Sequence, residues 1–190
     1  MTHFRQRLPL RDGLFLTDGG LETVLIFQQG VELASFAAID LMRRPEGPQI
    51  LRDYFEPYLD IARSAGTGLV LETPTWRASP DWAEPVGFTD LSQLADANRR
   101  GLDLTDQIRR ANATPTMPIV VSGCIGPRGD GYDPGQIMSV EAAESYHAWQ
   151  IEIFANGAAD LVSAITMTNI SEAVGIARAA KAHSIPVVIS

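Results

Sequence analysis

The sequence predicts an α/β fold of the TIM-type (β/α)8-barrel class, interrupted after about its fifth strand. Short apolar segments alternate with longer amphipathic segments, a pattern typical of parallel strands joined by right-handed helical crossovers. Polar residues follow successive strands and no Gly-x-Gly-x-x-Gly loop follows the first, which favours a barrel over a doubly wound sheet. A complete barrel needs about 250 residues, so we interpret the 190 residues as the N-terminal part of one barrel domain, residues 1–190.

Hydrophobic periodicity places each element in order along the chain. The expected strands cover residues 14–18, 69–71, 118–122, 160–165 and 186–190. The expected helices cover residues 21–29, 48–64, 90–112, 140–156 and 171–183. Gly66 and the Asn156-Gly157 pair are helix stop signals, and Ser139 followed by Glu141 is an imperfect N-terminal capping pattern.

Composition narrows the classes of partner. The formal net charge is −8 and the basic residues are scattered, which argues against nucleic acid or an anionic membrane surface. A single cysteine, Cys124, excludes an internal disulfide and fits a reducing compartment. There is neither a signal-peptide pattern nor an apolar run of membrane-spanning length. We expect a soluble cytoplasmic protein with small-molecule ligands, and an unpaired sheet edge that either joins a missing part of the barrel or makes the chain self-associate.

The segment Leu14–Thr23 carries the clearest chemical signal. An apolar run delivers Asp18, two glycines and Glu22 at its C-terminal end. In a barrel, this end of a strand opens into the ligand-binding mouth, and glycines allow the backbone to approach a ligand closely. The alternative interpretation is an ordinary turn in which Asp18 caps the next helix.

Four segments, taken together, resemble the homocysteine S-methyltransferase family. They occur in the family's order and spacing, and the resemblance extends from about residue 12 to residue 190. The segments are Asp18-Gly-Gly-Leu-Glu-Thr23, Leu71-Glu-Thr-Pro-Thr-Trp-Arg-Ala-Ser79, Ser122-Gly-Cys-Ile-Gly-Pro127 and Gly157-Ala-Ala-Asp-Leu161.

The resemblance implies a methyltransferase of methionine biosynthesis that moves a methyl group from a sulfonium, ammonium or methyl-cobalamin donor to homocysteine or a related thiol. In the family, zinc bound by three cysteines stabilises the acceptor as a thiolate, its nucleophilic form. The matching cysteine positions lie beyond Ser190, so Cys124 is expected to be structural. We therefore expect zinc in an intact parent, no zinc bound by residues 1–190 alone, and no activity of this part by itself.

The resemblance also assigns substrate-binding positions, and it assigns neither a catalytic residue nor a metal ligand within the chain. Asp18 matches the acid that accepts hydrogen bonds from the homocysteine amino group, and Gly19 and Gly20 match the turn beneath the amino acid. Thr73 and Thr75 match positions that line the mouth, where their hydroxyls donate to the substrate carboxylate or to backbone. Trp76 matches an aromatic position suited either to a methylated cation donor or to packing at the barrel rim. Arg77 opposes cation binding there unless it turns away or pairs with Glu72 or Asp81.

One position departs from the family pattern. Ile165 stands where many members have a glutamate that binds the substrate amine. An isoleucine cannot hold an ammonium group, which favours a less polar thiol as acceptor, with neutral hydrogen bonds from Thr166, Thr168 or Asn169. Glu172 is expected to stabilise the N-terminus of a helix that begins at Ser171.

Two alternatives come from other classes. A Schiff-base aldolase shares the barrel, but its lysine must project from a strand end, and the only lysine, Lys181, is expected on the outer side of the last helix. The other alternative is a noncatalytic fragment that retains half of a pocket.

Overall fold

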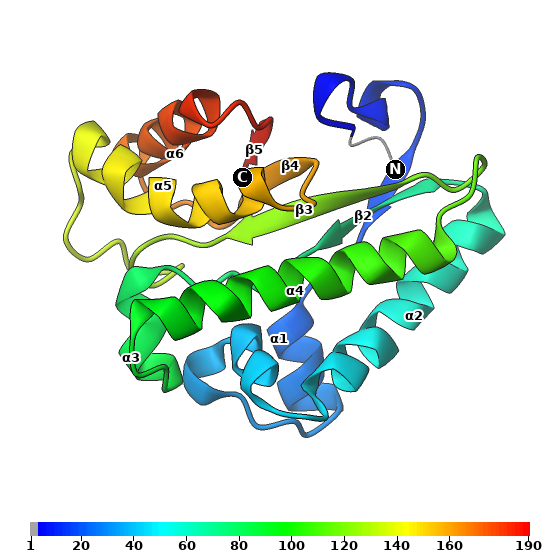
Figure 1. The fold of residues 1–190 in the computed structure, drawn as a ribbon, viewed down its shortest axis with the longest axis horizontal. Helices are drawn as coiled ribbons and strands as arrows, with labels where there is room; N and C mark the ends of the chain where they lie inside the picture. The colour runs from blue at the N-terminus through cyan, green and yellow to red at the C-terminus, as the bar shows by residue number, and fades with distance from the viewer. Residues whose placement is uncertain (1–3) are drawn as a thin grey trace.

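The computed structural model describes residues 4–190 and contains one five-stranded parallel sheet. The strands are β1 (Phe15–Thr17), β2 (Gly68–Glu72), β3 (Ile119–Ile125), β4 (Leu161–Ala164) and β5 (Val187–Ile189). They are hydrogen-bonded in sequence order, β1-β2-β3-β4-β5, whereas a doubly wound sheet reverses its strand order at a switch point. The predicted barrel class is confirmed: the chain forms a parallel half-barrel (Figure 1).

The helices follow the strands as the periodicity predicts. They are α1 (Leu21–Thr23), which continues as a π-helical turn over Val24–Gln28, α2 (Gly47–Ala65), α3 (Ala83–Val86), α4 (Leu91–Asn112), α5 (Val140–Asn156) and α6 (Ile170–Ala182). The predicted stop at Gly66 is confirmed, because this residue has φ 63° and caps α2. The Ser139 cap is also confirmed, since its hydroxyl accepts the Ala142 N–H at 3.2 Å. Lys181 is exposed near the end of α6.

Two predicted boundaries are wrong, and one short helix was not predicted. The helix α6 begins one residue earlier than predicted, at Ile170, because Asn169 caps it: Asn169 accepts the Glu172 N–H at 2.9 Å and its amide donates to the Glu172 carboxylate at 3.1 Å. Strand β3 continues three residues beyond Ser122, because Gly123 leaves room for the Phe154 ring, which lies 2.5 Å from where a Cβ would be. The short helix α3 has too few residues to produce a helical period.

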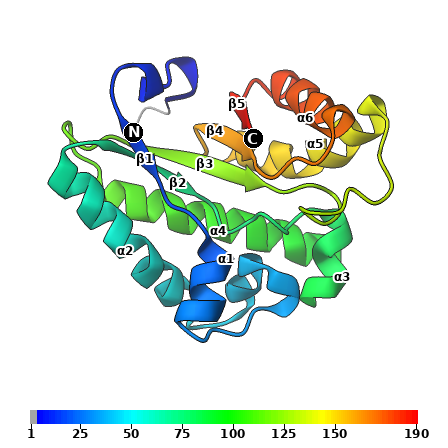
Figure 2. The ribbon, with the colours of Figure 1, turned by 180° about the vertical axis from the view of Figure 1, so that it is seen from behind.

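The sheet buries both faces. Outward-pointing residues such as Leu69, Leu71 and Val121 pack under the helices, whereas Val70, Val120 and Leu161 point to the inside of the half-barrel. The N-terminal segment lies across this inner face, with Phe4, Leu8, Leu10 and Phe15 against those three residues. Figures 1 and 2 show this segment and helices α2 and α4 on opposite sides of the sheet. In residues 4–190, no helix has both the length and the apolar character needed to cross a membrane.

Buried charges anchor the end of the sheet where the strands begin. Asp160 precedes β4 and accepts the Arg109 guanidinium at 2.8 Å, the Val121 N–H at 2.9 Å and the Phe4 N–H at 2.8 Å. The Arg5 guanidinium donates to four carbonyl oxygens at the C-terminal end of α5 and just beyond it. This end of the half-barrel is therefore closed by paired groups.

Candidate functional site

A pocket of about 520 Å³ opens at the C-terminal ends of the strands, where barrel enzymes place their ligands. It brings together the predicted residues Asp18, Gly19, Gly20, Thr73, Trp76 and Thr166. Glu22, Glu72, Arg77, Cys124, Tyr132 and Ile165 also contribute to its wall. Thr75, the remaining predicted residue, is fully buried behind this wall.

Asp18 is held at the mouth by two neighbouring elements. Its Oδ1 accepts the Glu72 N–H at 3.3 Å, and its Oδ2 lies 3.1 Å from the Tyr54 hydroxyl of α2. The Tyr54 hydroxyl is also 3.0 Å from the Gly19 carbonyl oxygen, so its single proton is shared between two acceptors. Burial is the main cause that raises the pKa of Asp18 to about 6, against the lowering effect of these hydrogen bonds.

The alternative role of Asp18 as a helix cap is wrong. The residue that precedes α1 is Gly20, whose φ of 65° places it in the left-handed region, and no side chain caps the helix there. The glycine is required because other residues are strained in this conformation. Asp18 thus stands free of the helix start and faces the pocket.

Glu72, the last residue of β2, is a pocket residue that the sequence interpretation missed. One of its carboxylate oxygens, Oε2, is buried without a hydrogen-bond partner. Burial first, and then the nearby charge of Asp18, raise the pKa of Glu72 to about 8. The signal was present in the sequence, because Glu72 ends an apolar strand just as Asp18 does.

Glu22, which follows the first apolar run in the sequence but was not assigned a binding role, also reaches the pocket, from α1. It is only 9% exposed, and its Oε1 accepts the Ala38 N–H at 3.3 Å. Burial raises its pKa as well, while the charge of Arg77 acts in the opposite direction. The pocket therefore holds three carboxyl groups whose ionisation is disfavoured by burial.

The Thr73 and Thr75 hydroxyls form a closed ring with the backbone of Cys124. The Cys124 N–H donates to Thr73 Oγ1 at 2.9 Å, and Thr75 Oγ1 donates to the Cys124 carbonyl at 2.7 Å. Because the Thr75 proton is used there, the 2.6 Å contact between the two hydroxyls requires Thr73 to donate to Thr75. The Thr75 proton is donated to the Cys124 carbonyl and the Thr73 proton to Thr75, so neither is free for a substrate carboxylate.

The described residues do not fit a zinc site. Cys124 is the only cysteine, and burial raises the pKa of its thiol well above the usual value, which disfavours the thiolate that binds metal. Across residues 4–190, no group of three or more His, Cys, Asp or Glu side chains is arranged to hold a metal ion.

Trp76 is packed into the rim of the pocket. Its indole N–H donates to Thr166 Oγ1 at 3.1 Å, and the Arg77 guanidinium lies 4.8 Å from its ring centroid. Arg77 also stacks on Trp82 at 4.3 Å and pairs with Asp130 at 2.7 Å. Among the described residues Arg77 pairs with neither Glu72 nor Asp81, the two partners considered from the sequence, and these contacts support the packing interpretation of Trp76.

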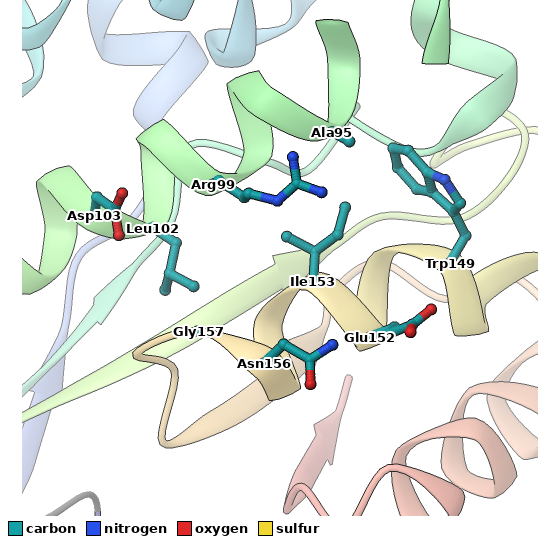
Figure 3. Close-up of a pocket in the computed structure, with 9 residues that line it drawn as sticks. All are labelled: Ala95, Arg99, Leu102, Asp103, Trp149, Glu152, Ile153, Asn156 and Gly157. Atoms are coloured by element: carbon teal, nitrogen blue, oxygen red, sulfur yellow. The ribbon is translucent and has the colours of Figure 1, made fainter. Parts of the chain in front are cut away.

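A second cavity, of about 410 Å³, lies between α4 and α5 on the outer side of the sheet. Figure 3 shows Arg99 and Trp149 facing each other across it, with Ile153 between them. None of the predicted site residues lines this cavity. The predicted site residues therefore lie in or directly behind the pocket at the strand ends, and not at this second cavity.

Comparison with known proteins identifies the family. The homocysteine S-methyltransferase family model matches residues 15–190. No curated protein matches the chain. Two crystal structures of the homocysteine methyltransferase MmuM from Escherichia coli are similar: the metallated form, at 26% identity and a TM-score of 0.74, and the oxidized form, at 25% and 0.77.

Both alignments cover the whole of this chain but only 66% and 65% of the two MmuM chains. The chain thus spans just under two thirds of their length. The apo form of MmuM, at 22% identity and a TM-score of 0.66, supports the fold alone. With a family match over residues 15–190, the chain belongs to the homocysteine S-methyltransferase family.

Proposed function

We propose that residues 1–190 form the acceptor-binding half of an S-methyltransferase that methylates homocysteine or a closely related amino thiol. The observation that carries this proposal is Asp18, a carboxyl at the pocket mouth that accepts hydrogen bonds but forms no ion pair with any described residue. A carboxylate in this state is suited to an ammonium group, because charge-assisted hydrogen bonds are among the stronger ones. The family match supports homocysteine as the class of acceptor.

Within this half of the barrel, the reaction requires orientation of the acceptor more than proton transfer. The acceptor sulfur attacks the methyl carbon as a thiolate, the bond from that carbon to the donor breaks, and the donor leaves with the bonding electrons. Holding the ammonium group at Asp18 fixes one end of the acceptor, so that the sulfur end can be aligned with the donor. The Gly19-Gly20 turn keeps side-chain bulk away from the bound amino acid.

Ile165 does not remove the case for an amino thiol. It lines the pocket and is half-buried, so it offers an apolar surface to the carbon chain of the acceptor. Glu22 and Glu72 supply carboxyl groups from other elements of the same pocket. This favours homocysteine over the less polar thiol that the sequence alone suggested.

The donor belongs to the sulfonium, ammonium or methyl-cobalamin class. Arg77 stacks on Trp76 and brings a positive charge to that side of the pocket, which opposes a permanent cation there. Since the residues described do not fit zinc, our proposal places zinc ligands outside residues 1–190. Residues 1–190 alone are then expected to show no turnover, and added zinc is not expected to restore it.

The test measures methyl transfer to homocysteine in the protein at its full natural length, with S-methylmethionine, betaine and methyl-cobalamin as donors. We expect turnover with at least one donor. Replacing Asp18 by Asn should lower kcat/KM for homocysteine about 10- to 150-fold, because about 1.5–3 kcal/mol is typical of a charge-assisted hydrogen bond. Asp53→Asn is the matched control, since Asp53 is exposed on α2, away from the pocket, and its carboxylate accepts a hydrogen bond from the Gln49 amide.

No turnover with any donor, or unchanged kinetics in a folded Asp18→Asn variant, would contradict the proposal. Turnover by residues 1–190 alone would show that the metal ligands have been misplaced.

A further inference from the structure

Glu72 occupies an unusual place on the inner face of the half-barrel. Val70, two residues earlier on the same strand, points inward, so the alternation of side chains places Glu72 on the same face, one layer nearer the mouth. Ser122 pairs with Glu72 in the register of β2 and β3, and its hydroxyl lies 2.7 Å from that of Ser163. Glu72 therefore lies between the hydroxyls of Ser122 and Ser163 on one side and the open pocket on the other.

The carboxyl of Glu72 is incompletely satisfied from within the protein. Its Oε2 is buried and has no partner, although a buried polar group without a hydrogen bond is normally costly. Glu72 also lies beside Asp18, whose Oδ1 is hydrogen-bonded to the Glu72 N–H. No cation lies between these two adjacent acids among the described residues. A bound cation would therefore stabilise their ionised forms.

Glu22 is the competing choice for a second acid, and its surroundings exclude it from this role. It already accepts the Ala38 N–H, and the charge of Arg77 favours its ionised form. Among the described residues no arginine acts on Glu72 in this way; the Ser122 and Ser163 hydroxyls lower its pKa, but burial and the charge of Asp18 outweigh them. Of the two glutamates, Glu72 has the greater need of a positive ligand.

We propose that Glu72 is the second carboxyl of the acceptor-ammonium site and that it releases its proton when the acceptor binds. This inference rests on the proposed function. In the step, the O–H bond of the Glu72 carboxyl breaks, the proton passes to solvent, and the carboxylate accepts an N–H of the bound ammonium group. Since ammonium has three N–H donors, Asp18 and Glu72 can share it.

The coupling between acceptor binding and proton release from Glu72 has a definite sign and an approximate size. With a pKa of about 8, Glu72 is mostly protonated at pH 7, and a bound ammonium group lowers that pKa by favouring the charged form. Acceptor binding at pH 7 should therefore release close to one proton, or about 0.9, from this residue. An acceptor without an amino group should release none from it.

The experiment is calorimetric titration at pH 7 in two buffers of different ionisation enthalpy, which counts released protons. It uses the protein at its full natural length, with homocysteine and 4-mercaptobutanoate, the same thiol acid without the amino group, as ligands. The variants are wild type, Glu72→Gln and, as a matched control, Glu56→Gln, an exposed residue of α2. The readout is the difference between variants, because ionisation of the acceptor thiol contributes equally to all of them.

We expect Glu72→Gln to release about one proton fewer than wild type with homocysteine and to bind it about tenfold more weakly. Both proteins should bind 4-mercaptobutanoate alike, and Glu56→Gln should match wild type with both ligands. Equal proton release and equal homocysteine affinity in wild type and Glu72→Gln would overturn the role of Glu72 and leave the proposed function standing. Failure of wild type to bind homocysteine would overturn both.

Discussion

Asp160 lies at the end of the half-barrel where the strands begin and Asp18, half-buried, at the end where they finish, and the surroundings of the two acids differ. Asp160 is fully buried and accepts hydrogen bonds from the Arg109 guanidinium and from two backbone N–H groups. Asp18 has a tyrosine and one backbone N–H but no ion pair among the described residues, and its neighbour Glu72 has an unpartnered oxygen. Asp160 is thus a buried charge that stabilises the fold, whereas Asp18 and Glu72 are acids that can bind a ligand.

The difference follows from the energetics of buried charge. An ion removed from water is stabilised by a fixed partner, or it shifts its pKa and becomes neutral. The first solution occurs at Asp160, where Arg109 also pairs with Asp106. The second occurs at the pocket, where burial raises the pKa values of Asp18 and Glu72 to about 6 and 8.

The largest expected effect is on stability, at the end of the half-barrel that contains the Asp160–Arg109 pair (the paired end). Asp160→Ala leaves the Arg109 charge short of a partner, and breaking a buried pair costs about 3–5 kcal/mol. Asp60→Ala is the control, because Asp60 and Arg63 form an exposed pair on α2, whose contribution is about 0–1 kcal/mol. Urea unfolding measures both variants. Equal losses of unfolding free energy would remove the distinction between the two ends.

The second prediction concerns the pH dependence of stability at the end that contains Asp18 and Glu72 (the unpaired end). An acid whose folded-state pKa is raised stabilises the fold below its unfolded pKa, and this contribution is lost as pH rises through the folded-state value. For Glu72 the window runs from its ordinary value of 4.5 to about 8. The free energy of unfolding should fall by up to about 1.4 kcal/mol per pH unit across that window.

Glu72→Gln should remove most of this fall between pH 6 and pH 8 and leave the part below pH 6 to which Asp18 contributes. Urea unfolding at a series of pH values gives the slope, and Glu56→Gln should keep the wild-type slope. A wild-type protein whose stability is flat between pH 6 and pH 8 would show that Glu72 ionises freely.

The third prediction adds a charge to the unpaired end. Ile165 lines the pocket with the other acids, so Ile165→Glu places a fourth carboxyl there and should cost about 1–3 kcal/mol of stability. It should not tighten homocysteine binding, because Asp18 and Glu72 already serve the ammonium group. Ile165→Gln, which adds the same polar length without charge, isolates the electrostatic part. Tighter homocysteine binding by the glutamate variant, measured calorimetrically, would refute this account.

The smallest effect concerns the threonine ring behind the pocket wall. Thr75→Val removes the donor to the Cys124 carbonyl and leaves Thr73 without its acceptor, at a cost of about 1–2 kcal/mol. Thr67→Val is a matched control, since the Thr67 hydroxyl is buried without a partner and its loss should be neutral or slightly stabilising. Thermal unfolding compares the two variants, and a neutral Thr75→Val would show that the ring is dispensable.

Much of the architecture was accessible from the sequence because each strand and long helix carries its own period and its own stop signal. The placement of Asp18 followed from its position at a strand end. Glu72 has the same position on the next strand, but a strand end does not say whether a side chain will find a partner. Glu22 reaches the pocket from a helix, and the role of Thr75 depends on the backbone of Cys124, 49 residues away. Those features depend on tertiary contacts that no local pattern records.

The most direct test of the account is to titrate the carboxyl carbons of Asp18 and Glu72 by NMR, with and without homocysteine. The account predicts that Glu72 in the free protein titrates near pH 8 and Asp18 near pH 6, and that homocysteine lowers both values while 4-mercaptobutanoate lowers neither. Ordinary titration of both groups in the free protein, at about pH 4 to 4.5, would contradict it, because the pocket would then hold charges that need no ligand.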